Sequence, residues 1–236
     1  MSGRNLRLLF LGAPGVGKGT FGKLISKQLE IPHISAGDIL RGEIDNKTDL
    51  GLQVQPLLAA GQLIPDILIA AAIEKEIDER SKDGNTGFIL DGFPRTLAQA
   101  KLLDSFTTID MALHITLARW VVVAKLKGRM LCQGCGKSFN SAHIIDPPYR
   151  MPAILQNKES CSRGAEYCGS HGTLVGRLDD TDEVIENRLQ VYDDTILPIL
   201  DYYKGKSKLE TFDVVTGVDD TPAMIQLIST ASRTNT

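Results

Sequence analysis

The sequence predicts an α/β fold in which a mostly parallel sheet is covered by helices on both faces. Short apolar runs alternate along the chain with segments of helical periodicity, and this alternation is typical of βαβ units. A glycine-rich turn joins the first apolar run to the first helical segment. The composition, with 42% hydrophobic and 23% charged residues, is sufficient for a buried core. We expect strands near residues 6–11, 31–34, 88–90, 111–115 and 209–215.

Length and charge limit the classes of function. A chain of 236 residues forms one large domain or one core with insertions. The net charge of −3 and the pI near 5.8 argue against broad electrostatic binding to nucleic acid or to an anionic membrane. No apolar run approaches the roughly 20 residues that span a bilayer. We expect no nucleic-acid or membrane partner and a cytoplasmic location, with the mitochondrion as the alternative.

The first strand leads into the stretch Gly12-Ala13-Pro14-Gly15-Val16-Gly17-Lys18-Gly19-Thr20. Glycines let the backbone wrap closely around an anion, because a Cβ would block the approach. The helix that follows offers unpaired amides and the positive end of its dipole, and Lys18 adds a mobile charge. This is the context of a phosphate-binding loop. The general pattern has Ser or Thr directly after the lysine, whereas here Gly19 stands there and Thr20 follows.

The second strand is followed by a helical segment that carries Arg41 in its first or second turn. In parallel sheets ligands bind beyond the carboxyl ends of the strands, where a planar guanidinium can hold a phosphate through two hydrogen bonds. A second helical pattern covers residues 50–60. Residues 60–66 then end it and start another helix, with Pro65 near the first turn.

The third strand ends in a carboxylate, Asp91. A tight turn follows over residues 92–95, and Thr96 starts a helix that carries Gln99. A carboxylate at a strand end near a phosphate loop commonly holds magnesium or its water shell. We therefore expect Asp91 to hold Mg²⁺ through water.

Together these motifs give the chain a family resemblance. The glycine-rich loop, residues 37–41 and the element Asp91-Gly92-Phe93-Pro94-Arg95-Thr96 are similar to those of the adenylate kinase family of nucleoside monophosphate kinases. The match continues through Gly128-Arg129, then through Arg177-Leu178-Asp179-Asp180 and Arg188, and so covers nearly the whole chain. The Gly19-Thr20 variant of the loop is itself a feature of this family.

The resemblance implies a P-loop nucleoside triphosphate hydrolase fold, with a five-stranded parallel sheet and two mobile insertions. The core would comprise residues 1–34, 65–127 and 181–236. One insertion, residues 35–64, would close on a nucleoside monophosphate, and the other, residues 128–180, would form a long lid over the triphosphate. The family is usually monomeric, and we expect a monomer.

The same resemblance implies a role for each matching residue. The catalytic residues would be Lys18, Arg95, Arg129, Arg177 and Arg188. Those that bind ATP would be Gly15, Val16, Gly17, Lys18, Gly19, Thr20, Lys125 and Arg129. Those that bind AMP would be Ala36, Arg41, Gln62, Leu63, Ile64, Gly92, Arg95, Gln99, Arg177 and Arg188.

The activity implied is reversible, magnesium-dependent phosphoryl transfer from ATP to AMP, giving two ADP, in a site from which lid closure excludes water. Two positions depart from the usual pattern. Ala36 replaces a threonine beside the AMP base, as in many UMP/CMP kinases, although Thr96, Gln99 and the long lid favour AMP. Lys125 replaces an arginine that packs over the donor base. A GTP:AMP phosphotransferase is therefore the main alternative, followed by a UMP/CMP kinase.

Cysteines gather in the lid. Cys132 and Cys135 form a C-x2-C pair, and Cys168 and His171 follow with C-x2-H spacing. This pattern predicts a structural zinc site with four protein ligands. Family lids exist with and without metal, so a metal-free lid with reduced thiols remains an alternative. In another ligand set Cys161 replaces Cys168 or His171.

Overall fold

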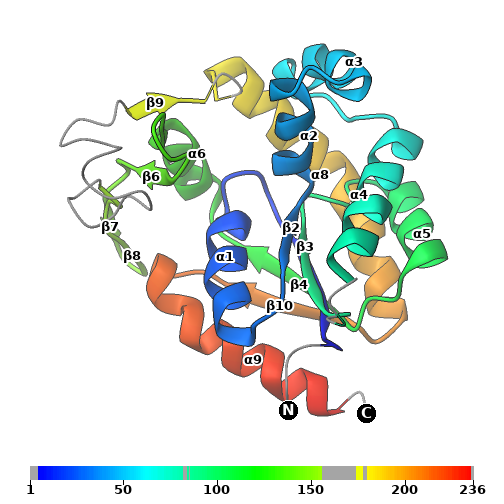
Figure 1. Cartoon of the computed structure of the whole chain (residues 1–236). Coiled ribbons are helices and arrows are strands. Elements are labelled where there is room, and N and C mark those ends of the chain that lie inside the picture. The colour runs from blue at the N-terminus through cyan, green and yellow to red at the C-terminus, as the bar shows by residue number, and fades with distance from the viewer. Residues whose placement is uncertain (1–4, 82–83, 85, 156–173, 178–179, 235–236) are drawn as a thin grey trace.

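The computed structural model describes residues 5–81, 84, 86–155, 174–177 and 180–234. Five of the strands in these segments form one sheet: β1 (Arg7–Leu11), β2 (His33–Ser35), β3 (Phe88–Asp91), β4 (Met111–Thr116) and β10 (Leu209–Asp213). Their order is β10-β4-β1-β3-β2, and every neighbouring pair is parallel (Figure 1). The predicted fold class, an α/β fold with a five-stranded parallel sheet, is confirmed.

Strand positions differ from the sequence prediction by only a few residues. The second strand begins at His33 rather than at Ile31, because the Ile31 amide donates to Ser26 O at the end of the first helix. Pro32 has no amide hydrogen to donate to a neighbouring strand. The last strand ends at Asp213, where Val215 leaves the sheet and its amide donates to Asp220.

Helices pack on both faces of the sheet. They are α1 (Lys18–Leu29), α2 (Ala36–Asp45), α3 (Asp49–Ala59), α4 (Asp66–Ser81), α5 (Leu97–Phe106), α6 (Arg119–Lys127), α8 (Asp182–Gly205) and α9 (Thr221–Thr234), with a 3₁₀ turn, η2 (Gly217–Asp220). Threonine or serine hydroxyls cap the amino ends of α2, α3, α5 and α8, where they accept hydrogen bonds from first-turn amides. These caps explain where those helices begin.

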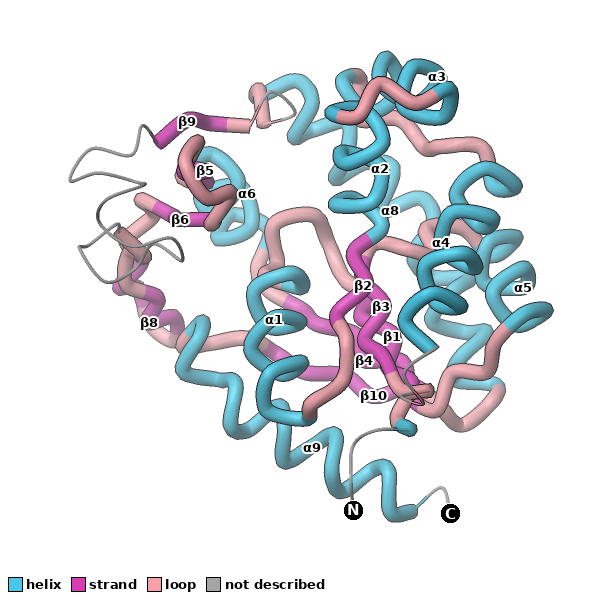
Figure 2. The backbone as a smooth tube through the Cα atoms, in the orientation of Figure 1, coloured by secondary structure: helices cyan, strands magenta, loops and turns pink. Residues whose placement is uncertain are grey.

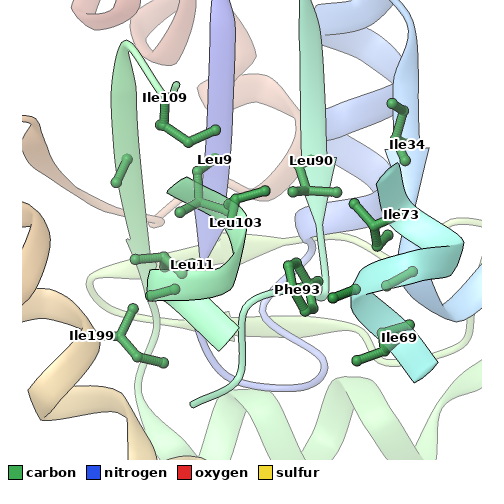
Figure 3. Close-up of a cluster of buried hydrophobic side chains, with 14 of the residues drawn as sticks. Leu9, Leu11, Ile34, Ile69, Ile73, Leu90, Phe93, Leu103, Ile109 and Ile199 are labelled. Carbon is green, nitrogen blue, oxygen red and sulfur yellow. The ribbon is translucent and has the colours of Figure 1, made fainter. Parts of the chain in front are cut away.

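Both faces of the central strand are buried, which accounts for its continuous apolar sequence. Leu9 and Leu11 face α4, α5 and α8 in one cluster, where Ile73 and Leu103 are fully buried (Figure 3). Leu8 and Phe10 face the opposite side and pack with residues of α1 and α9. The sheet is therefore held between two apolar layers.

The lid segment forms a separate small sheet. Strands β5 (Arg129–Cys132), β6 (Ser138–Asn140) and β9 (Leu174–Gly176) are antiparallel in the order β6-β5-β9. A hairpin of β7 (Ile144–Asp146) and β8 (Tyr149–Met151) follows β6 along the chain (Figure 2). Both pieces branch from the core between α6 and α8.

The β7–β8 hairpin is seated on the core. Ile144 and Met151 are buried in the same cluster as strand β4 and helix α9. The Arg150 amide donates to Val215 O at 2.9 Å, and the Tyr149 ring meets Trp120 of α6 edge to face, with the ring centroids 5.7 Å apart. Part of the predicted lid is thus in contact with the core. The proposed domain boundaries themselves remain a prediction.

Within the described segments, no helix combines the length and the apolar character needed to cross a bilayer.

Truncation of a buried side chain on α4 should destabilise the fold, whereas truncation of an exposed one on the same helix should not. Ile73 is fully buried and Ile67 is 77% exposed. We expect Ile73→Ala to lower the free energy of unfolding by about 3 kcal/mol, through lost apolar burial and a residual cavity. Ile67→Ala should change it by less than about 0.5 kcal/mol. Urea denaturation of both variants measures this, and equal midpoints would contradict the core assignment.

Candidate active site

A cleft of about 690 Å³ opens between the carboxyl edge of the sheet and the lid. Its floor is the glycine-rich loop over residues 12–20, with Asp91 at the end of β3. Its other walls come from α2, α8, the lid segments 137–140 and 151–155, and residues 214–218. The cleft thus lies where the parallel topology predicts ligand binding.

The loop has the backbone of an anion cradle. Gly12, Gly15 and Gly17 all have positive φ angles, of 143°, 85° and 106°, which side-chain-bearing residues rarely adopt. The N-cap of α1 is Gly17, which provides no side-chain hydrogen bond, and the first turn contains no acidic residue. Gly17 therefore leaves the first amides of α1 without a side-chain cap. The residues that carry these amides line the cleft.

Lys18 is held within this loop. Its Nζ donates to Gly12 O at 2.7 Å and to Ala13 O at 2.9 Å. Burial of the ammonium group lowers the pKa of Lys18 from 10.5 to about 8, against the raising effect of the Asp91 carboxylate. The side chain is thus already located where an outer phosphate would meet it.

Other positive charges converge on Lys18. Arg95, Arg188 and Arg129 each lower the pKa of the lysine further by charge repulsion, and they come from three separate segments. All three line the cleft, as do Arg41 and Arg177. This excess of positive charge in one partly enclosed space is suited to polyphosphate.

Asp91 approaches the loop closely. A Cβ on Gly19 would lie 3.4 Å from Asp91 Oδ2, and the Asp91 side chain is 11% exposed. A carboxylate oxygen beside a phosphate loop is suited to magnesium or its water shell. His33 Nε2 lies 3.6 Å from the same oxygen, and its ring packs over Gly22. The spacing of His33 and Asp91 in the sequence, 58 residues apart, gave no sign of this proximity.

One carboxylate binds two of the arginines. Arg129 donates to Asp180 through both Nε and Nη2, with 2.6 Å between Nε and Oδ2. Arg188 Nη1 donates to Asp180 Oδ1 at 3.3 Å. The Asp180 side chain is only 5% exposed, and those of the arginines are 17% and 13% exposed. The Asp180 carboxylate therefore holds Arg129, at the start of the lid, and Arg188, on α8, close to each other.

Two more of the arginines, Arg41 and Arg95, make local contacts. Arg41 pairs with Asp38 one turn earlier on α2, and this hydrogen bond lowers the pKa of Asp38 although burial acts to raise it. Arg95 Nε donates to Gly92 O at 2.9 Å, so the guanidinium folds back over its own turn. Both line the cleft, and Arg41 lies within the predicted insertion of residues 35–64.

Gln99 lies behind this turn. It is 2% exposed, its Oε1 accepts from the Arg95 amide at 2.7 Å, and its Nε2 donates to Asp66 at 2.8 Å. In the part of the chain that the structure describes, the cleft lining does not include Gln99, nor does it include four other residues expected to bind AMP: Ala36, Gln62, Leu63 and Ile64. Their assignment stays a prediction.

The other expected residues meet in the cleft. Residues 15–20 line it, and so do Lys125, Gly92 and Asp91. Burial lowers the pKa of Lys125. The sequence analysis missed the cleft-lining segment Thr216, Gly217 and Val218. Its position just past β10 is the signal that could have revealed it.

The lid cysteines are described only in part. Cys132 is buried, and Cys135 packs in the same small cluster beside Phe139. The chain turns back between them, since the Gly136 amide donates to Cys132 O at 2.8 Å and the Cys132 amide donates to Lys137 O at 3.0 Å. Cys161, Cys168 and His171 lie outside the described residues, so the zinc prediction remains untested.

Comparisons with known proteins show the family of this chain. The family model described as "Adenylate kinase" matches residues 10–208. "Probable adenylate kinase 1, chloroplastic" of Oryza sativa subsp. japonica is 38% identical over 96% of this chain and 76% of its own length. "GTP:AMP phosphotransferase" of Plasmodium falciparum (isolate 3D7) is 38% identical over 91% of this chain and 92% of its own. "Adenylate kinase" of Caldicellulosiruptor bescii is 40% identical over 86% of this chain and 89% of its own length. The chain therefore belongs to the adenylate kinase family and is a nucleoside monophosphate kinase.

Proposed function

We propose that the enzyme transfers the terminal phosphoryl group of ATP to AMP, reversibly, giving two ADP. The observation that carries the proposal is the convergence of Lys18 with arginines from three separate segments in one cleft. The acceptor is already an anionic phosphate oxygen, so the reaction needs no strong base. It needs positive charge around the transferred group and the exclusion of water.

Each charged group has a place in this scheme. Lys18 and the loop amides would hold the outer phosphates of the donor, and Arg41 and Arg95 the phosphate of AMP. Arg129, Arg177 and Arg188 would surround the transferred group when the lid closes. The family implies the use of magnesium-bound nucleotide. Asp91 would hold the water shell of that ion, which neutralises charge on the donor phosphates when bound.

GTP as donor is the second candidate. The half-buried Lys125 lacks the planar face with which an arginine stacks on a base. A relative of comparable identity carries the name GTP:AMP phosphotransferase. Both observations concern the donor base and leave the phosphate chemistry unchanged.

A panel of nucleotides tests the proposal. With AMP fixed, we expect ATP to give a higher kcat/KM than GTP, and with ATP fixed we expect AMP to exceed UMP and CMP. Lys18→Ala should reduce transfer by at least about 100-fold, because the lost charge acts on the transferred group. A higher kcat/KM with GTP would select the second candidate. Near-normal transfer by Lys18→Ala would contradict the assigned role of the loop.

The lowered pKa of Lys18 should make nucleotide binding depend on pH. Phosphates beside the ammonium group raise its pKa above the value of about 8 in the free enzyme. Binding near pH 8.5 should therefore take up protons, and affinity should fall as pH rises above 8. Calorimetry at pH 8.5 in two buffers of different ionisation enthalpy measures the uptake. Lys18→Arg, which stays charged, should lose it, and an unchanged uptake in this variant would contradict the prediction.

We also propose that the lid holds a structural zinc ion through Cys132, Cys135, Cys168 and His171. The support is the ligand spacing, together with the turn that brings Cys135 into the same cluster as the buried Cys132. A closed set of four ligands leaves no open position for catalysis, so the ion would only stabilise the lid.

Elemental analysis of the purified enzyme should give one zinc per chain, and Cys132→Ser should lose it. Cys161→Ser is the matched control: it retains zinc if the proposed ligand set is right and loses it if Cys161 is a ligand. A wild-type enzyme without stoichiometric zinc would overturn the proposal.

A further inference from the structure

The side chain of Asn140, at the end of β6, joins two parts of the chain near the start of the lid. Its Nδ2 donates to Lys125 O in the last turn of α6 at 2.8 Å. Its Oδ1 accepts from the Ala142 amide at 2.9 Å. Its main chain pairs with Ile154 through two further hydrogen bonds, of 2.9 and 2.8 Å. The side-chain amide of Asn140 thus donates to the last turn of α6 and accepts from the loop after β6, so that it connects these two segments.

Gly128 fits closely against this amide. A Cβ at position 128 would lie 2.7 Å from the Ala142 nitrogen and 2.8 Å from Asn140 Oδ1. The φ and ψ angles of Gly128, −83° and −1°, are open to any residue, so space rather than backbone conformation requires the glycine. The Ser141 amide also donates to Gly128 O at 2.8 Å. Residue 128 is therefore held against residues 140–142.

Arg129 follows Gly128 directly and faces Asn140 across the β5–β6 pair. Its guanidinium is held at the other end by Asp180. The main chain of Arg129 is thus located by the contacts of Asn140, and the tip of its side chain by a carboxylate. Both anchors are needed to fix the direction in which the side chain crosses the cleft, because an arginine side chain has several rotatable bonds.

We propose that Asn140 is a positioning residue for phosphoryl transfer and that it acts through Arg129. The inference rests on the proposed function, in which Arg129 surrounds the transferred group. Aspartate at this position would keep the acceptor for Ala142 but would turn a second oxygen towards the Lys125 carbonyl. Alanine would supply neither bond. Displacement of a catalytic group by about 1 Å is enough to slow transfer markedly.

Steady-state kinetics of Asn140→Ala and Asn140→Asp test the role. We expect kcat to fall by about 10- to 100-fold in Asn140→Ala, with the KM for AMP little changed, because Arg41 and Arg95, outside the lid, would hold the phosphate of AMP. Asn140→Asp should also lose activity. Ser141→Ala is the matched control, since it removes a hydroxyl contact of 3.3 Å and keeps the main-chain bond to Gly128. It should behave as the wild type.

A double-mutant cycle separates positioning from general damage. In an Arg129→Ala background, Asn140→Ala should cause no further loss of kcat, because the group through which it acts is absent. Losses that multiply would overturn the inference, as would wild-type kcat in Asn140→Ala. If the alanine variant does not fold, Asn140→Asp replaces it in the same cycle. Absence of transfer in the wild-type enzyme would instead overturn the proposed function.

Discussion

The active site depends on holding several positive charges together before any phosphate arrives. Burial lowers the pKa of Lys18, and repulsion from Arg95, Arg188 and Arg129 lowers it further. Among the described residues, several groups offset this repulsion: Asp180 pairs with two arginines, Asp91 lies beside the loop, and two loop carbonyls accept from the lysine. In the proposed function, the phosphates of bound nucleotides would supply further negative charge to this cleft.

The fold explains how such a group is assembled. Parallel strands bring the phosphate loop and Asp91 to one edge of the sheet, and the two buried faces make that edge rigid. The arginines reach the same point from α2, from the turn after β3, from the lid and from α8. In the proposed function, groups on the rigid sheet edge would bind the nearest part of the donor. Groups on separate segments would meet only when those segments are correctly placed.

Local patterns in the sequence predict most of the fold and many of the residues that line the cleft. The loop glycines, the strand ending in Asp91 and the hydroxyl caps each depend on neighbours a few residues away, so the sequence alone predicts them. Asp180 is different: it pairs with Arg129, 51 residues earlier, through the placement of the lid. The docking of the β7–β8 hairpin and the burial of Gln99 behind the turn likewise depend on tertiary contacts, which residue spacing does not encode.

The hairpin has a practical consequence for spectroscopy. Trp120 is the only tryptophan of the chain, and in the structure it is half exposed and covered in part by the Tyr149 ring. Its emission therefore reports the seating of one short hairpin and says little about the apolar layers around the sheet. An unfolding curve followed by fluorescence and one followed by circular dichroism sample different parts of the molecule. If the two curves coincide, the β7–β8 hairpin and the core unfold as one cooperative unit.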